Sequence, residues 1–190
     1  MKNVKEKSEI VNIRKEHALQ QKKKAREKRE LGVFGENVAE FLLCNAGFNK
    51  GKNLNREKKN TPYADIYAKR HCKSYVISVK TRHKYQLDGR LNDRYKLERN
   101  CHDKAKVVSE QYGGAIPAWV TIAIDIDTDT LSAYFETLAF LGGNKGVCMK
   151  EEATKEYECL AKDIRIDTAK IDKDDYNKLK IARNIEKGGE

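Results

Sequence analysis

The chain lacks the features that mark membrane, secreted and disulfide-bonded proteins. Its 190 residues contain no apolar run near the ~18 residues that a membrane span requires. No hydrophobic block follows the charged first residues, so we expect no secretory signal. The five cysteines form no C-x-x-C pair and are odd in number, which argues against a disulfide framework or a zinc ribbon. We therefore expect a cytoplasmic protein with no membrane partner.

Positive charge is present in excess and is unevenly distributed. The net charge of +10 is concentrated in residues 1–31, at +6, and residues 50–106, at +11, whereas residues 32–49 carry −2 and residues 107–190 carry −5. Bases gathered in one part of a chain indicate a surface that faces a polyanion. A membrane surface is less favoured, because no basic segment has the broad apolar stripe of an interfacial helix. The charge pattern thus predicts a nucleic acid as the partner.

Hydrophobic periodicity predicts an α/β or α+β domain built on a mixed central sheet, and α/β is the favoured class. In chain order we expect an exposed helix or partly ordered basic arm at 1–30 that ends near Gly32, a helix at 33–47, a weak strand and loop at 48–62, strands at 64–68 and 75–80, a charged loop at 81–102, a helix at 103–112, strands at 118–126 and 130–135, and one or two helices in 136–190. The chain accordingly divides into a basic helical arm at 1–31, a core at 32–135 and an acidic helical C-terminal extension packed on the core at 136–190.

Groups of catalytic type lie on the two strands of the predicted hairpin. Ser78 and Lys80 are two residues apart, so their side chains emerge on the same face of one strand, and Asp65 lies on the other strand. In a favourable register an acid, a hydroxyl and an ammonium converge at one point. A solvated sheet edge with alternating polar residues gives the same pattern. The residues alone therefore leave both interpretations open.

The order of these groups resembles the PD-(D/E)XK nuclease superfamily over about residues 31–135. The motif Gly35-Glu36-x-x-Ala39-x-x-Leu42 is similar to the helix that carries that superfamily's first acid. Asp65 corresponds to the strand acid and Lys80 to the lysine of the acid-x-Lys triplet. The resemblance implies a restriction-endonuclease-like core: a helix, three antiparallel strands, a helix and a further strand, here with an N-terminal basic helix and C-terminal helices.

What the resemblance implies for function is a metal-dependent DNA endonuclease, either restriction-like or junction-resolvase-like. DNA is accordingly the expected partner, and RNA is less favoured. Asp65, Lys80, Glu36 and Ser78 would form the catalytic group, and Asp65, Glu36 and the backbone carbonyl of Val79 would hold Mg²⁺, or Mn²⁺ in its place. Lys80 would orient the attacking water or neutralise charge on the phosphate. Ser78 would hold a metal-bound water by a hydrogen bond. Enzymes with this core often act as dimers, so a homodimer is an expectation as well.

Two positions depart from the motif. Ala64 stands where the motif has a proline, and Ser78 stands where it has an acid. A hydroxyl is a neutral and weak ligand for a hard divalent cation, so the site has one carboxylate fewer. The departure keeps a second function open, which is a catalytically inactive nucleic-acid-binding protein of the same fold. A third is an RNA- or ribosome-associated interaction protein in which the basic helix does the binding.

Further basic residues lie close in sequence to the candidate site. Arg82, His83 and Lys84 follow the strand that carries Lys80. Lys104 and Lys106 lie at the start of the helix predicted at 103–112. Basic side chains beside a phosphate-cleaving centre suit contacts to the sugar-phosphate backbone. We expect these five residues to bind the nucleic acid.

Overall fold

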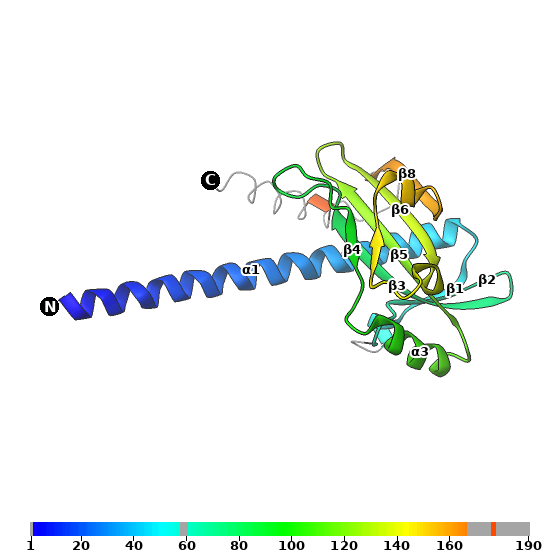
Figure 1. Cartoon of the computed structure of the whole chain (residues 1–190), viewed down its shortest axis with the longest axis horizontal. Coiled ribbons are helices and arrows are strands. Elements are labelled where there is room, and N and C mark those ends of the chain that lie inside the picture. Colours follow the sequence, from blue (N-terminus) through cyan, green and yellow to red (C-terminus); the bar gives the residue numbers. More distant parts are fainter. Residues whose placement is uncertain (1, 58–60, 167–175, 178–190) are drawn as a thin grey trace.

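The structure, a computed structural model, describes residues 2–57, 61–166 and 176–177. Its first element is one long helix, α1 (Lys2–Asn45), whose N-terminal half extends away from the rest of the molecule (Figure 1). The expected break near Gly32 is wrong. A glycine inside a helix costs only about 1 kcal/mol relative to alanine, and Leu31 and Phe34 on either side of it are buried against the sheet. The helices expected at 1–30 and 33–47 are therefore continuous.

Six strands form a mixed sheet in the order β1-β2-β3-β5-β6-β8. They are β1 (Asn49–Asn53), β2 (Ile66–Arg70), β3 (Lys73–His83), β5 (Ile116–Asp125), β6 (Thr130–Thr137) and β8 (Glu158–Arg165). Strands β3 and β5 run parallel, and the other neighbours are antiparallel. Helix α3 (Cys101–Gln111) follows β3 in the chain and provides the crossover that a parallel pair requires. The expected order of helix, three antiparallel strands, helix and further strand is confirmed.

The hairpin between β2 and β3 has a turn of two residues. His71 and Cys72 both adopt positive φ angles, 48° and 64°, and the flanking residues Arg70 and Lys73 are paired. A turn with two left-handed residues matches the right-handed twist of an antiparallel hairpin. The short turn fixes the register, and Ile66 consequently pairs with Ile77. This register places the start of β2 beside the middle of β3.

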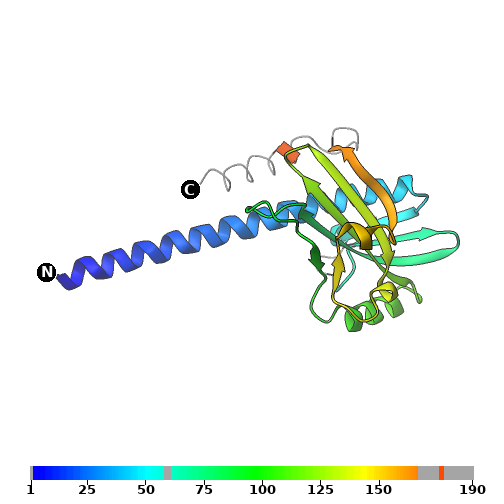
Figure 2. The same ribbon diagram turned by 45° about the horizontal axis from the view of Figure 1, so that its top comes forward.

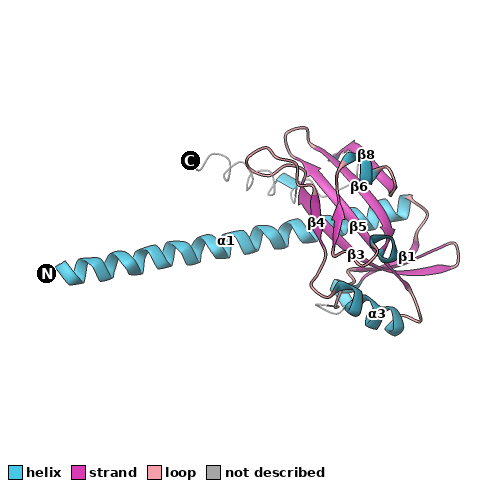
Figure 3. Ribbon diagram, in the orientation of Figure 1, coloured by secondary structure: helices cyan, strands magenta, loops and turns pink. Residues whose placement is uncertain are grey.

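Helices cover both faces of the sheet. The side chains of β3 and β5 alternate between two hydrophobic cores, one on each face. Helix α1 packs Phe34 and Val38 on one face, against residues such as Ile77. Helix α3 packs Val108 on the other face, where the core includes Trp119. Figures 2 and 3 show α1 running behind the strands and the shorter α3 beside the sheet, in a body made mostly of strand and loop. The described helices include none that is long and apolar enough to cross a bilayer.

Several smaller elements complete the fold. They are α2 (Leu54–Glu57), β4 (Arg94–Lys96), the 3-10 helix η1 (Leu138–Leu141), β7 (Gly146–Cys148) and α4 (Glu151–Thr154). Strand β4 lies within the segment expected to be a loop and pairs with β7. Helices are present after residue 136, as expected, but η1 and α4 are four residues each. The prediction of a helical extension is wrong in part, because strands β7 and β8 also lie in it, and β8 extends the sheet by pairing with β6. Residues 167–175 and 178–190 of this extension lie outside the described residues.

Candidate active site

The backbone of helix α1 packs closely against the Thr81 side chain of strand β3 at the candidate site. Gly35 is buried, and a Cβ atom placed on it would lie 1.6 Å from Thr81 Oγ1. The absence of a side chain at Gly35 therefore allows the helix backbone to approach β3. Glu36 is the next residue and is half-buried. The glycine of the helix motif thus has a packing role, since it sets how close the Glu36 backbone lies to the strand.

Asp65 lies immediately before β2 and is hydrogen-bonded to β3. Its backbone N–H donates to the carbonyl oxygen of Ile77 at 2.9 Å, and its Oδ2 accepts the N–H of Val79 at 2.7 Å. The carboxylate therefore accepts a backbone hydrogen bond from β3 just before the first residue of β2. Val79 lies between Ser78 and Lys80 in the strand. The expected proximity of Asp65 to the triplet on β3 is present in the structure.

Two asparagines that precede β2 join the carboxylates of Glu36 and Asp65. Asn55 Nδ2 donates to Glu36 Oε1 at 3.0 Å and to Asp65 Oδ1 at 3.1 Å. Asn53 Nδ2 donates to Glu36 Oε2 at 3.2 Å. Asn53 Oδ1 also accepts the backbone N–H groups of Asn55 at 3.0 Å and Arg56 at 3.3 Å, which caps the start of α2. One amide group thus bridges an acid from α1 and an acid from the sheet.

The other two predicted catalytic residues lie on β3. Ser78 is 1% exposed, and its Oγ has no hydrogen-bond partner among the described residues. Lys80 is half-buried and interacts electrostatically with both Asp65 and Glu98. Glu98 precedes α3, accepts the N–H of Tyr63 at 3.0 Å and forms an ion pair with Lys104. The structure therefore places a third acid, Glu98, close enough to Lys80 to interact with its charge.

Burial of the two bridged carboxylates shifts their ionisation. Burial raises the pKa of Glu36, the negative charge of Asp65 raises it further, and the hydrogen bonds from Asn55 and Asn53 offset part of the rise. Burial also raises the pKa of Asp65, although Lys80 and the Val79 N–H act in the opposite direction. Desolvation and like charge disfavour two ionised carboxylates at such a site. A bound cation would relieve both effects.

The oxygen atoms at this site suit a magnesium ion. The described residues include no cluster of three His, Cys, Asp or Glu side chains able to hold a metal. Mg²⁺ needs no such cluster, because it binds through one or two carboxylates and completes its shell with waters and substrate phosphates. Glu36 and Asp65 supply two carboxylates that share one amide. The donor set therefore fits a hard divalent cation and does not fit a tetrahedral zinc site.

The five predicted nucleic-acid contacts have different surroundings. Arg82 and Lys106 are exposed, and His83 is half-buried at the end of β3. Arg82 Nη1 donates to the carbonyl oxygen of Thr81 at 2.8 Å. Lys104 is half-buried and paired with Glu98, next to the site. Arg82 and Lys106 consequently present their charge to solvent, whereas Lys104 is already neutralised in part.

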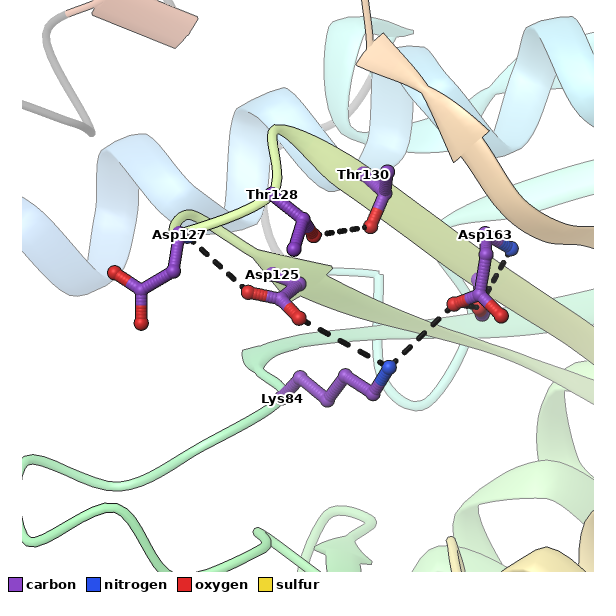
Figure 4. Close-up of polar contacts among 7 residues, drawn as sticks. Lys84, Asp125, Asp127, Thr128, Thr130 and Asp163 are labelled. Atoms are coloured by element: carbon purple, nitrogen blue, oxygen red, sulfur yellow. Dashed lines mark hydrogen bonds and ion pairs between the residues drawn. The ribbon is translucent and has the colours of Figure 1, made fainter.

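Lys84 lies between two acids at the far end of β3 (Figure 4). Its Nζ is 3.4 Å from Asp163 Oδ1 and 3.9 Å from Asp125 Oδ2. Asp125 Oδ1 also accepts the N–H of Asp127 at 3.1 Å, within the turn that joins β5 to β6. Asp125 therefore takes part both in the turn and in an ion pair with Lys84. Lys84 thus links the end of β3 to β5 and β8 through ion pairs.

Sequence reasoning missed Asn53, Asn55 and Glu98. The first two lie in the segment 48–62, where the polar and basic composition indicated a weak strand and a loop. The spacing Asn-x-Asn before the strand acid is the signal that could have drawn attention to them, since amides are common at helix N-termini and in metal sites. Glu98 lies in the charged loop, and nothing local to it indicates that it faces Lys80.

Comparison with known proteins finds similarity to a solved structure but no matching family model. No model of a protein family matches the sequence, and no curated protein does. Among solved structures, the fold is similar to that of Hjc, a Holliday junction resolvase from the archaeal hyperthermophile Archaeoglobus fulgidus. The two chains are 17% identical, the match covers 73% of this chain and 94% of that chain, and the TM-score is 0.47. A similarity this weak does not indicate what the protein does.

Proposed function

We propose that this protein is a Mg²⁺-dependent DNA endonuclease of the PD-(D/E)XK superfamily, restriction-like or junction-resolvase-like. The observation that carries the proposal is the pair of carboxylates, Glu36 and Asp65, that share the Asn55 amide beside the triplet containing Lys80. Both carboxylates lie in surroundings that raise their pKa, so the site favours a cation. Strand order and the excess of basic residues support the same function.

The residues divide the chemical task among them. Glu36, Asp65 and the backbone carbonyl of Val79 would hold Mg²⁺, which acts as a Lewis acid and lowers the pKa of a bound water when present. The Lys80 ammonium stabilises the negative charge that develops on the phosphate as the phosphodiester bond is broken. The Ser78 hydroxyl, which has no partner among the described residues, is available to hydrogen-bond a water. Arg82 and Lys106 bind neighbouring phosphates.

A cleavage assay on the full chain tests the function directly. The protein is incubated with labelled four-way DNA junctions, DNA duplexes and RNA duplexes of matched sequence, in Mg²⁺, in Mn²⁺ and in EDTA. We expect DNA cleavage with either metal and none in EDTA, because the two carboxylates need a cation to act on a phosphodiester. Gel-shift measurements on the same samples show whether each substrate is bound.

The outcomes separate the three functions. Binding of DNA without cleavage in either metal would contradict the enzyme and favour the inactive nucleic-acid-binding protein, for which Ser78 in place of an acid is the supporting feature. Preferential binding of RNA, abolished when residues 1–31 are deleted and unchanged by Asp65→Ala, would favour the RNA- or ribosome-associated interaction protein. Cleavage products whose pattern differs between junctions and duplexes would distinguish the resolvase-like from the restriction-like activity.

One face of α1 is expected to contribute phosphate contacts. Residues Lys22, Arg29 and Glu36 are spaced by seven, so their directions around the helix differ by only about 20° per step. Arg29 lies about 10 Å and Lys22 about 21 Å along the axis from Glu36. Both basic side chains are exposed. A nucleic-acid strand that leaves the site along this face would therefore meet two positive charges.

Paired alanine variants test this face. We expect K22A/R29A to weaken DNA binding and to reduce the slope of log affinity against log salt by about 2, since each lost phosphate contact removes about one released counterion. The matched control is K23A/K24A, which removes the same charge from exposed positions about 100° or more from Glu36 around the helix. Affinity is measured by fluorescence anisotropy in EDTA. An equal loss in both variants would show that charge, and not the helix face, matters.

A further inference from the structure

Strand β3 presents a hydroxyl where the resemblance implies a carboxylate. Ser78 is almost fully buried, and its Oγ is neither charged nor hydrogen-bonded to a described residue. It is a weak ligand for a hard cation. A metal site made from Glu36 and Asp65 therefore has room for a third side-chain oxygen from another element.

Asn55 is the side chain that touches both carboxylates. Its Nδ2 lies 3.0 Å from Glu36 Oε1 and 3.1 Å from Asp65 Oδ1, so the amide occupies the position between the two acids. Among the described residues, none donates a hydrogen bond to Asn55 Oδ1. The backbone of Asn55 is fixed because its N–H donates to Asn53 Oδ1 at the start of α2. The side chain is thus held at the site, and its oxygen accepts no hydrogen bond from a described residue.

The two ends of a carboxamide have opposite chemistry and nearly equal shape. The NH₂ end donates hydrogen bonds to carboxylates, and the oxygen end is a hard ligand of the kind that Mg²⁺ and Ca²⁺ take from asparagine. Rotation about the last side-chain bond exchanges the two ends without moving the backbone. The same residue can therefore hold the two acids together without a cation and offer an oxygen to a cation.

We propose that Asn55 is the third side chain of the metal site and replaces the carboxylate that β3 lacks at Ser78. The proposal rests on the proposed function, because it assumes that Glu36 and Asp65 hold a divalent cation. The substitution of an amide for an acid lowers the negative charge of the side-chain ligands from three to two. Metal affinity then depends more strongly on the phosphates of the substrate, which complete the shell of the cation.

Metal binding by the full chain without DNA tests the proposal. Isothermal titration with Mn²⁺ and, separately, with Mg²⁺ is applied to the wild type, Asn55→Ala, Asn55→Asp and the control Lys73→Gln. We expect Asn55→Ala to weaken binding by about 10- to 100-fold, as for other residues that support metal sites. Lys73→Gln, which changes an exposed residue at the start of β3, should bind as the wild type does. Asn55→Asp should bind more tightly, because it adds a third carboxylate.

The aspartate variant shows whether Asn55 binds the metal or only holds the two acids together. If Asn55 only held the acids together through its NH₂ group, an aspartate would repel them, and Asn55→Asp would bind metal more weakly than Asn55→Ala. That result, or wild-type affinity in Asn55→Ala, would overturn the proposal while leaving the proposed function in place. A wild-type chain that binds neither ion would overturn the metal-dependent function and this inference with it. Circular dichroism melts confirm that each variant is folded.

Discussion

Replacing Asp65 with asparagine is expected to reduce Mg²⁺-dependent DNA cleavage by about 1000-fold or more. The substitution removes one of two carboxylates while keeping the shape of the side chain and an oxygen for the Val79 N–H. A metal ion supplies several kcal/mol of transition-state stabilisation, and each 1.36 kcal/mol corresponds to a factor of ten in rate. Single-turnover cleavage rates at saturating protein measure the loss separately from DNA binding. Cleavage at the wild-type rate would contradict the assignment of Asp65.

The same substitution is expected to make the protein more stable. Burial raises the pKa of Asp65 in the folded state, so the folded chain binds a proton more tightly than the unfolded chain does. The stability associated with that proton is present below the unfolded pKa and is lost as the pH rises through the folded pKa. The advantage of Asp65→Asn over the wild type should therefore grow as the pH rises above the ordinary pKa of an aspartate, which thermal melts at a series of pH values measure. A variant that melts below the wild type at pH 8 would contradict this account.

Lys80 has a separable role that a matched lysine variant can reveal. Lys80→Gln should slow cleavage but leave Mn²⁺ bound, because the ammonium acts on the phosphate and is not a metal ligand. Lys73→Gln is the control, since Lys73 is an exposed lysine at the start of the same strand. We expect it to cleave as the wild type does. Equal rates for Lys80→Gln and the wild type would remove Lys80 from the catalytic group.

Gly35→Ala is expected to destabilise the protein by about 3 kcal/mol and to impair cleavage. The added Cβ would lie 1.6 Å from Thr81 Oγ1 and 2.7 Å from Thr81 Cβ, so α1 and β3 must separate. Overpacking of a buried contact costs about 1–3 kcal/mol and occasionally more. The expected sign is informative, because alanine normally stabilises a helix by about 1 kcal/mol relative to glycine. Movement of α1 would also displace Glu36 from the site.

Gly32 and Thr81 provide the controls for this prediction. Gly32 lies on the same helix, and a Cβ placed there meets nothing within 4 Å, so Gly32→Ala should stabilise the protein. The double variant Gly35→Ala/Thr81→Gly removes the clashing side chain and should be more stable than Gly35→Ala alone. Urea unfolding measures all three free energies. Gly35→Ala that is as stable as Gly32→Ala would show that the helix does not need this close contact with β3.

The sequence predicted the elements whose signal is local. The hairpin that carries Asp65, Ser78 and Lys80 was predicted because two strand-like runs are joined by a short connector, and the buried strand β5 was predicted from its apolar run. The helix of Glu36 was predicted from its apolar face. Alternation along β3 was enough to place Ser78 and Lys80 on one side of the strand. Each of these inferences depends on residues that are neighbours in the chain.

Features that depend on distant residues were decided by the packing of the folded chain. Strand β8 forms because the edge of β6 accepts it, although its own residues alternate only weakly between buried and exposed. Asn55 is part of the candidate site because α2 carries it within hydrogen-bonding distance of Glu36 on α1 and of Asp65 before β2. Glu98 is part of it because the loop before α3 brings this acid close enough to interact with Lys80. Hydrophobic periodicity reports which face of an element is buried, but not which other element covers it. That choice is made by long-range contacts, and here it determines which amide and which acids surround the two bridged carboxylates.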